Sequence, residues 1–142
     1  MKIVSTISRY LLALIFIAFG LNGFLNFIPA VPMPPLASQF VGALVQSHYM
    51  TVVFILELAA GVLLLLNRYV PLALTLLAPV IVNILLFHVF MATSGLPLAI
   101  LVALLWIVLA SRERSAFSGL FQQSGAADSA RADRRPGTAL NA

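Results

Sequence analysis

The chain has 142 residues, of which 62% are hydrophobic and only 8% are charged. A soluble domain carries roughly 25% charged residues, so the composition excludes an ordinary water-soluble protein and predicts an integral membrane protein. The formal net charge of +4 comes from basic residues that flank apolar runs instead of forming a patch, so we expect a lipid bilayer as partner and no nucleic acid. The absence of cysteine excludes disulfides and thiolate metal sites, and with only two histidines we expect no metal site.

Four apolar runs follow one another along the chain, separated by short segments rich in proline, glycine and asparagine. Each run approaches the ~20 residues that a helix needs to cross a bilayer. We therefore predict an all-α integral membrane four-helix bundle over residues 1–112. A cleavable signal peptide is the alternative for the first run, but that run is longer than the apolar core of such a peptide. The predicted spans are residues 10–28, 49–66, 71–92 and 95–111.

Two segments of the chain are not expected to cross the membrane. Residues 35–47 follow a proline pair and place apolar residues on one helical face, which predicts a short amphipathic helix between the first two spans. This helix would lie on the membrane surface or re-enter the membrane, and the surface position is favoured. Residues 113–142 are polar and without periodicity, so we predict a disordered cytoplasmic tail.

The distribution of basic residues predicts the orientation. With four spans, all basic residues up to residue 114 fall on one side, whereas the two connections on the other side carry no charge. Cytoplasmic loops are enriched in Lys and Arg, so both termini are expected in the cytoplasm. The arginines expected at the cytoplasmic interface are Arg9, Arg68 and Arg112.

The most unusual residue is Glu57, in the middle of the run "VVFILELAAGVLLLL". A charged side chain at the centre of a membrane helix costs roughly 2.5–3.5 kcal/mol on insertion scales, so such residues are usually paired or functional. From the helical rise, Glu57 lies about 12 Å below the outer end of the second span and about 16 Å from Arg68. Arg68 is therefore excluded as a direct ion-pair partner, while Gly61 shares the face of Glu57 and would allow a neighbouring helix to pack closely.

Other polar residues of the predicted spans lie at similar depths. The first span presents Asn22 and Asn26 beside Gly20 and Gly23, which would serve close helix packing. The third span carries an asparagine and a histidine in its outer half. These residues need not have a function. The two asparagines of the first span could only form hydrogen bonds between helices, and the histidine could only serve packing. We predict an outward-opening polar pocket formed by Glu57, His88, Asn83, Asn22 and Asn26.

Three stretches of the chain resemble the DoxX-like family of membrane proteins. These are "RYLLALIFIAFGLNGFLNFIP", "MPPLASQFVGAL" and "ILELAAGVLLLLNRYVPLALTLLAPVIVNILLFHVF". The last is similar to the family pattern E-L-x-x-G-x-x-L-L-x-x-R, followed by a third helix with asparagine and histidine. The resemblance implies a multi-pass protein of the bacterial cytoplasmic membrane, and it relates the family's polar residues to Glu57, Asn83 and His88. Some relatives are subunits of thiosulfate:quinone oxidoreductases, and others are linked to thiol-redox complexes.

Three functions are compatible with these features. The first is a membrane subunit of a quinone- or sulfur-linked redox complex, which would bind a small molecule in the pocket and need a membrane or peripheral partner protein. The second is a structural or assembly factor whose polar residues only hold the helices together. The third is a conduit for protons or small molecules, for which a homo-oligomer would be needed. The sequence contains no complete catalytic motif, and no cofactor is evident from it. A quinone is a ligand compatible with the first of these functions.

Overall fold

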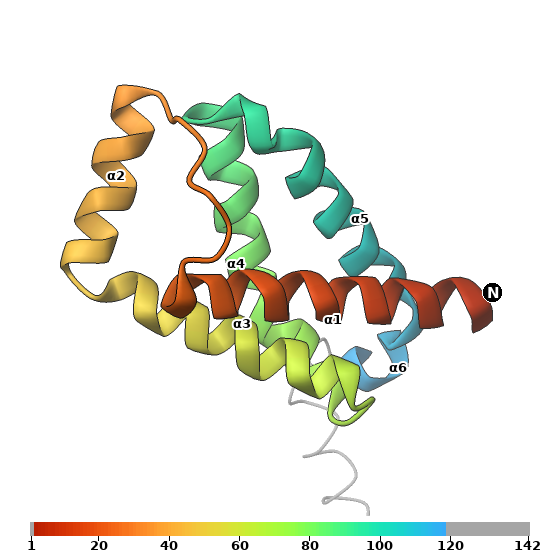
Figure 1. Ribbon diagram of the computed structural model, residues 1–142. Coiled ribbons are helices and arrows are strands. Elements are labelled where there is room, and N and C mark those ends of the chain that lie inside the picture. The colour runs from red at the N-terminus through yellow and green to blue at the C-terminus, as the bar shows by residue number, and fades with distance from the viewer. Residues whose placement is uncertain (1, 119–142) are drawn as a thin grey trace, which may run out of the picture.

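A computed structural model describes residues 2–118 of the chain, and every regular element within this range is a helix. Figure 1 shows α1 and α3 side by side and antiparallel, with α4 and α5 behind them and α2 set apart at one edge. The long helices are α1 (Lys2–Leu25), α3 (Tyr49–Leu65), α4 (Val70–Phe90) and α5 (Leu96–Arg112). The short helices are α2 (Pro35–Gln46), η1 (Thr93–Gly95) and α6 (Arg114–Phe117).

The apolar helices make this a membrane protein. Three of the segments among residues 2–118 are long and apolar enough to cross a bilayer: Ile3–Leu25, Val70–Phe90 and Thr93–Arg112. With 17 residues, α3 is about 25 Å long, which is shorter than the ~30 Å of a hydrocarbon core. It becomes a fourth span only together with α2, from which it is bent by 84°.

The four long helices contact one another in a closed ring. Helix α1 packs against α3 and α5, and α4 packs against the same two helices from the other side. The largest fully buried side chains come from the middle of α1, the last turn of α3 and the first half of α4. They are Phe16, Leu12, Leu64, Leu74 and Leu77.

Glycines allow α1 and α3 to approach closely. A Cβ atom on Gly61 would lie 3.1 Å from the carbonyl oxygen of Ala13, and one on Gly20 would lie 3.1 Å from the backbone nitrogen of Leu58. A Cβ atom on Gly23 would overlap the ring of Phe54. Small residues of this kind let two membrane helices pack backbone to backbone. The helix-packing interpretation of Gly20, Gly23 and Gly61 therefore has a direct geometric basis.

An arginine and a tight turn finish the C-terminal end of α3. The guanidinium of Arg9 donates a hydrogen bond to the carbonyl of Leu64 at 2.6 Å, and the same carbonyl also accepts from the amide of Asn67 at 3.1 Å. Asn67 adopts a left-handed conformation (φ 54°), and the amide of Arg68 then donates to the carbonyl of Leu63 at 3.0 Å. This is the Schellman arrangement. We call this side of the molecule, with Arg9 and the α3–α4 turn, the arginine end.

Helix α1 ends earlier than the sequence predicted. The first span was expected to reach residue 28, but the helix ends at Leu25 and Asn26 has a left-handed φ of 51°. Asparagine tolerates this conformation better than most residues, which makes it a common helix stop. The side-chain oxygen of Asn22 then accepts a hydrogen bond from the amide of Ile28 at 2.6 Å. Both asparagines thus form the end of α1.

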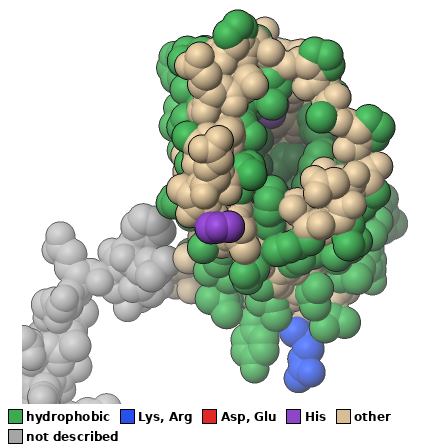
Figure 2. Space-filling view, turned by 60° about the vertical axis from the view of Figure 1, so that its left-hand side comes forward, with side chains coloured by type: hydrophobic (Ala, Val, Ile, Leu, Met, Phe, Trp, Pro, Cys, Tyr) green, Lys and Arg blue, Asp and Glu red, His purple; other side chains and the backbone are tan. Residues whose placement is uncertain are grey.

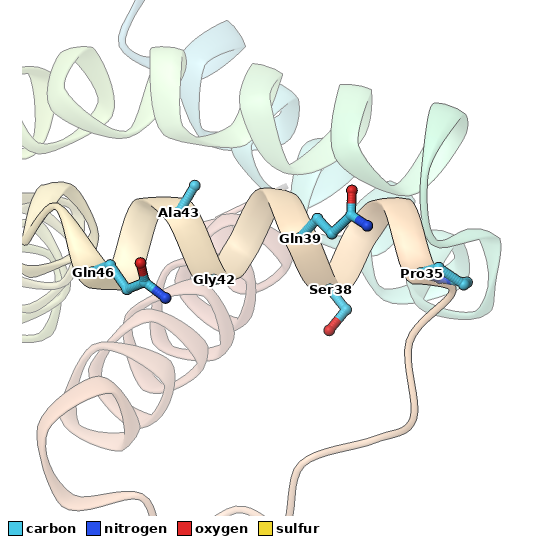
Figure 3. A pocket seen from close by; sticks show the side chains of 6 residues that line it. All are labelled: Pro35, Ser38, Gln39, Gly42, Ala43 and Gln46. Atoms are coloured by element: carbon cyan, nitrogen blue, oxygen red, sulfur yellow. The ribbon is translucent and has the colours of Figure 1, made fainter.

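Helix α2 covers the predicted amphipathic segment, and it runs alongside α4 (Figures 1 and 3). The chain turns from α2 into α3 at His48, whose φ of 59° is left-handed. The ring of Phe40 stacks on that of Phe87 in α4, with centroids 6.1 Å apart. Apart from such contacts α2 is mostly exposed, with Ala37 as its one buried residue.

The predicted disordered tail begins later than expected. Residues 114–117 form α6, and the half-buried Phe117 packs against the core of the long helices. The tail prediction is therefore wrong for these residues, because the large apolar surface of Phe117 packs against the long helices. Residues 119–142 lie outside the part of the chain that the structure describes.

Candidate functional site

Glu57 lies in the middle of α3 and points inward. Its side chain is only 6% exposed, and α3 beyond Thr51 in its first turn is otherwise apolar on every side. The Oε2 atom is buried and has no hydrogen-bond partner among the described residues. A buried polar group without a partner costs several kcal/mol in an apolar medium, of the order of 1–3 in protein mutants. Glu57 therefore does not contribute to stability in this conformation.

A cavity of about 180 Å³ opens in front of Glu57. Only two of its lining residues are ionisable, Glu57 and His88, and the rest are apolar. Figure 2 shows a hollow in one face of the molecule with one histidine side chain deep inside it, whereas the other histidine lies at the surface. The apolar lining consists of Ile15, Phe16, Phe19, Ile84, Leu98, Ala99 and Val102.

The orientation of His88 is fixed by the backbone. Its Nδ1 lies 2.8 Å from the carbonyl oxygen of Ala92, and because a carbonyl can only accept, Nδ1 carries the proton. In the neutral ring, Nε2 is then a hydrogen-bond acceptor. The ring lies directly over Gly95, where a Cβ atom would overlap it, and edge-on to Phe87 at 5.1 Å between centroids. The histidine is thus held in one tautomer and one position.

The cavity combines two polar atoms with an apolar lining, which favours a small amphipathic ligand. The acceptor Nε2 of His88 suits a ligand hydroxyl or N–H group, and the carboxyl of Glu57 suits a donor or an acceptor according to its own protonation. A volume of about 180 Å³ is close to the ~150 Å³ of an engineered cavity that binds benzene and well below the ~300 Å³ of the smallest drug-sized sites. A single ring therefore fits inside the cavity.

The cavity is closed toward the arginine end. Phe16 forms part of its floor, and the side chains of Leu12, Leu64 and Leu77 beyond it are fully buried. No polar side chain other than Glu57 and Ser8 is buried among the described residues. In this conformation the site is a pocket with one closed end.

The structure brings only two of the five predicted pocket residues together. Glu57 and His88 line the same cavity, but Asn22, Asn26 and Asn83 do not. Asn22 and Asn26 end α1, as described above. Asn83 is exposed on the outer side of α4, where its side-chain nitrogen donates to the carbonyl of Pro79 at 2.9 Å. The five-residue pocket was therefore wrong for the three asparagines, because similar depth does not imply a shared face.

The predicted interfacial arginines lie near the arginine end. Arg9 binds the end of α3 and stacks over Tyr10 at 4.4 Å, and Arg68 is exposed in the α3–α4 turn. Arg112 is the last residue of α5, whose second half is tied to the first half of α4 by a hydrogen bond from Trp106 to the carbonyl of Leu74. In Figure 2 the visible basic side chains lie at one end only.

Sequence reasoning missed most of the residues that shape the cavity. Phe19, Ala99 and Val102 are ordinary residues of apolar helices, and no local signal separates them from lipid-facing neighbours. Gly95 could have been found, since a glycine in the short turn after a polar histidine often marks a close approach. What it approaches, however, follows only from the fold.

A larger and more open hollow of about 580 Å³ runs along α2. Its lining residues come from α2 alone and form one face of the helix, with the polar side chains of Ser38, Gln39 and Gln46 (Figure 3). Because one exposed helix face does not enclose a ligand, we place the candidate site at Glu57 and His88.

Within residues 2–118 no three His, Cys, Asp or Glu side chains are close enough to hold a metal ion.

No protein-family model, curated protein or solved structure matches this chain.

Proposed function

We propose that this protein binds a small hydroxylated ring compound between Glu57 and His88, as the membrane subunit of a redox complex. The observation that carries the proposal is a buried carboxyl oxygen without a partner in the same cavity as a histidine of fixed tautomer. Polar groups of this kind are retained inside a membrane protein when they serve a ligand. The cavity volume supports a single ring as the bound group.

A quinol headgroup is the ligand that we propose first. Its ring suits the apolar lining, and one hydroxyl can donate to Nε2 of His88 while the opposite oxygen meets Glu57. The oxidised quinone has two carbonyl oxygens and no donor for Nε2, so the reduced form should bind better. The resemblance to DoxX-like proteins, some of which belong to quinone-linked complexes, supports this choice. A partner protein would supply the other half of such a complex.

The purely structural alternative is less well supported. Polar residues that hold helices together do so by bonding to each other or to the backbone. The side chains of Arg9 and Trp106 behave in this way, since each donates to the carbonyl of a neighbouring helix. Glu57 has an unpartnered oxygen instead, so it costs stability.

A conduit is also less well supported, because buried leucines close the cavity toward the arginine end.

We further propose a four-span topology in the bacterial cytoplasmic membrane with both termini in the cytoplasm. The basic residues near the arginine end support this orientation by the positive-inside rule. The cavity would then open in the outer half of the membrane.

Binding of labelled hydroquinone to the protein in lipid nanodiscs tests the proposal, with empty nanodiscs as the blank for partitioning into lipid. Saturable binding is expected for hydroquinone, weaker binding for benzoquinone, and none for 1,4-dimethoxybenzene, which has no donor. Equal binding of the dimethoxy compound would contradict the proposal.

Two alanine-to-leucine variants provide a matched pair. Ala99 is buried at the cavity wall, so Ala99→Leu should fill the cavity and abolish saturable binding. Ala59 is exposed on α3 close to Glu57, so Ala59→Leu should bind as the wild type does. If both variants bind hydroquinone equally well, the ligand does not occupy this cavity.

A further inference from the structure

One face of α4 points away from the other helices and carries an amide among apolar side chains. Leu72, Val82 and Leu86 on this face are 51%, 53% and 49% exposed, and Asn83 is exposed beside them. The exposed positions alternate in steps of three and four residues, which is the spacing with which two helices pack along a shared seam. We call this row the α4 stripe: Leu72, Thr75, Pro79, Val82, Leu86 and Val89.

The side chain of Asn83 is only partly satisfied within its own chain. One of its N–H groups donates to the carbonyl of Pro79, at 2.9 Å. An asparagine amide offers two N–H groups and one carbonyl oxygen. Within residues 2–118 the structure gives its second N–H and its carbonyl oxygen no partner. By contrast, the hydroxyl of Thr75 donates to the carbonyl of Pro71 on its own helix.

The position of Asn83 makes these unpaired groups costly. Helix α4 is one of the segments that can cross a bilayer, and Asn83 lies about 10 Å from its C-terminal end by the helical rise. At that depth lipid offers no hydrogen bonds, and each unsatisfied polar group costs several kcal/mol. The amide therefore needs a partner outside its own chain.

We propose that the α4 stripe is the interface with a second copy of this chain, in which two Asn83 side chains bond to each other. An amide is self-complementary, since the N–H of one copy can meet the carbonyl oxygen of the other in both directions around a two-fold axis. The stripe itself is uncharged and apolar apart from Thr75, whose hydroxyl is already satisfied, so it offers nothing for a charged partner. This pairing is independent of the Glu57–His88 cavity.

Cysteine cross-linking tests the interface directly, because the chain contains no cysteine of its own. Leu86 lies on the stripe three residues beyond Asn83, so Leu86→Cys should give a disulfide-linked dimer when the protein is oxidised in lipid at high dilution. The matched control is Leu104→Cys on α5, a side chain that is 55% exposed but lies outside the stripe. We expect a dimer from Leu86→Cys and only the background of random collisions from Leu104→Cys, because both variants keep Asn83 and differ only in where the cysteine lies.

A second substitution at Asn83 separates the amide from simple apolar contact. Leu86→Cys combined with Asn83→Leu should cross-link no more than the Leu104→Cys control, whereas Asn83→Gln, which keeps an amide, should retain most of the dimer. Because Asn83 is exposed, both double variants should fold, which the yield of monodisperse protein would verify. Equal cross-linking at residues 86 and 104, or full cross-linking with Asn83→Leu, would overturn the proposal. A cross-linked product in native membranes that is not twice the mass of the chain would assign the face to another protein and overturn it as well.

Discussion

The arginine end and the cavity end of this molecule are built from the same four helices and packed in opposite ways. At the arginine end, Leu12, Leu64 and Leu77 are fully buried, and side-chain hydrogen bonds from Arg9 and Trp106 tie neighbouring helices together. At the cavity end, the same helices separate around about 180 Å³ and leave a carboxyl oxygen without a partner.

This difference separates stability from function. Close packing and satisfied polar groups stabilise a membrane protein, whereas a cavity with a fixed histidine and an unpaired carboxyl does not. The arginine end thus serves as the scaffold, and the cavity end carries the features that a ligand requires. The predictions below test this division, beginning with the largest expected effect.

Truncation of a core leucine at the arginine end should lower the free energy of unfolding more than any other substitution proposed below. We expect Leu77→Ala to lower the free energy of unfolding by about 2 kcal/mol, the lower part of the range for buried leucines, because lipid replaces water in the unfolded state. Ile84→Ala, beside the cavity, should cost less than about half of this, since its side chain already borders empty space. Unfolding in mixed micelles, followed by the single tryptophan, measures both values. Equal losses would show that the two ends do not differ in packing.

The glycine crossing of α1 and α3 should be the next most sensitive feature. Gly61→Ala places a Cβ atom 3.1 Å from backbone atoms of α1, so the helices must separate, at an expected cost of about 1–2 kcal/mol. Gly42→Ala in α2 is the control, because nothing lies within 4 Å of the added atom. That variant should be neutral or slightly stabilising, by up to about 1 kcal/mol, through helix propensity. A Gly61→Ala protein as stable as the wild type would contradict the close packing of α1 against α3 at this glycine.

Removal of the hydrogen bond between Arg9 and the C-terminal end of α3 should have a smaller effect on the free energy of unfolding. Arg9→Met keeps much of the side-chain length but removes the charged donor to the carbonyl of Leu64, which then accepts only from the amide of Asn67. We expect a loss of about 1 kcal/mol in unfolding free energy. Hydrogen exchange of the last turn of α3 should increase at the same time. Unchanged exchange there would mean that the bond does not hold this end of the helix.

The smallest effect is expected at Gly95, and it should be on binding. Gly95→Ala pushes the ring of His88 from its position without removing any polar group. The affinity for hydroquinone should fall by about threefold, the lower part of what one hydrogen bond contributes, while the unfolding free energy stays close to that of the wild type. Unchanged affinity would show that the position of His88 is not important for the ligand.

Much of the fold follows from the sequence, because a long apolar run has few alternatives in a bilayer. The four long helices, the amphipathic segment and the packing role of Gly20, Gly23 and Gly61 all agree with simple patterns of length and residue size. The end of α1 does not follow from such patterns, because the apolar run continues past Asn26. Only the hydrogen bond to the side chain of Asn22 shows why the helix ends there.

The site was predicted less completely. Glu57 and His88 are chemically conspicuous in an apolar chain, but Asn83 is equally conspicuous and lies on the outer face. Depth along each helix can be counted from the sequence, whereas the rotation of one helix against another depends on packing. That rotation decided which polar residues share the cavity.

The most direct test of the central claim is the free energy of unfolding of Glu57→Leu in lipid or mixed micelles. If Glu57 serves a ligand and not the scaffold, the variant should be at least as stable as the wild type, because an unpaired buried oxygen has been removed, and it should lose saturable hydroquinone binding. A loss of stability greater than about 1 kcal/mol would instead assign Glu57 to the scaffold and contradict the division between the two ends.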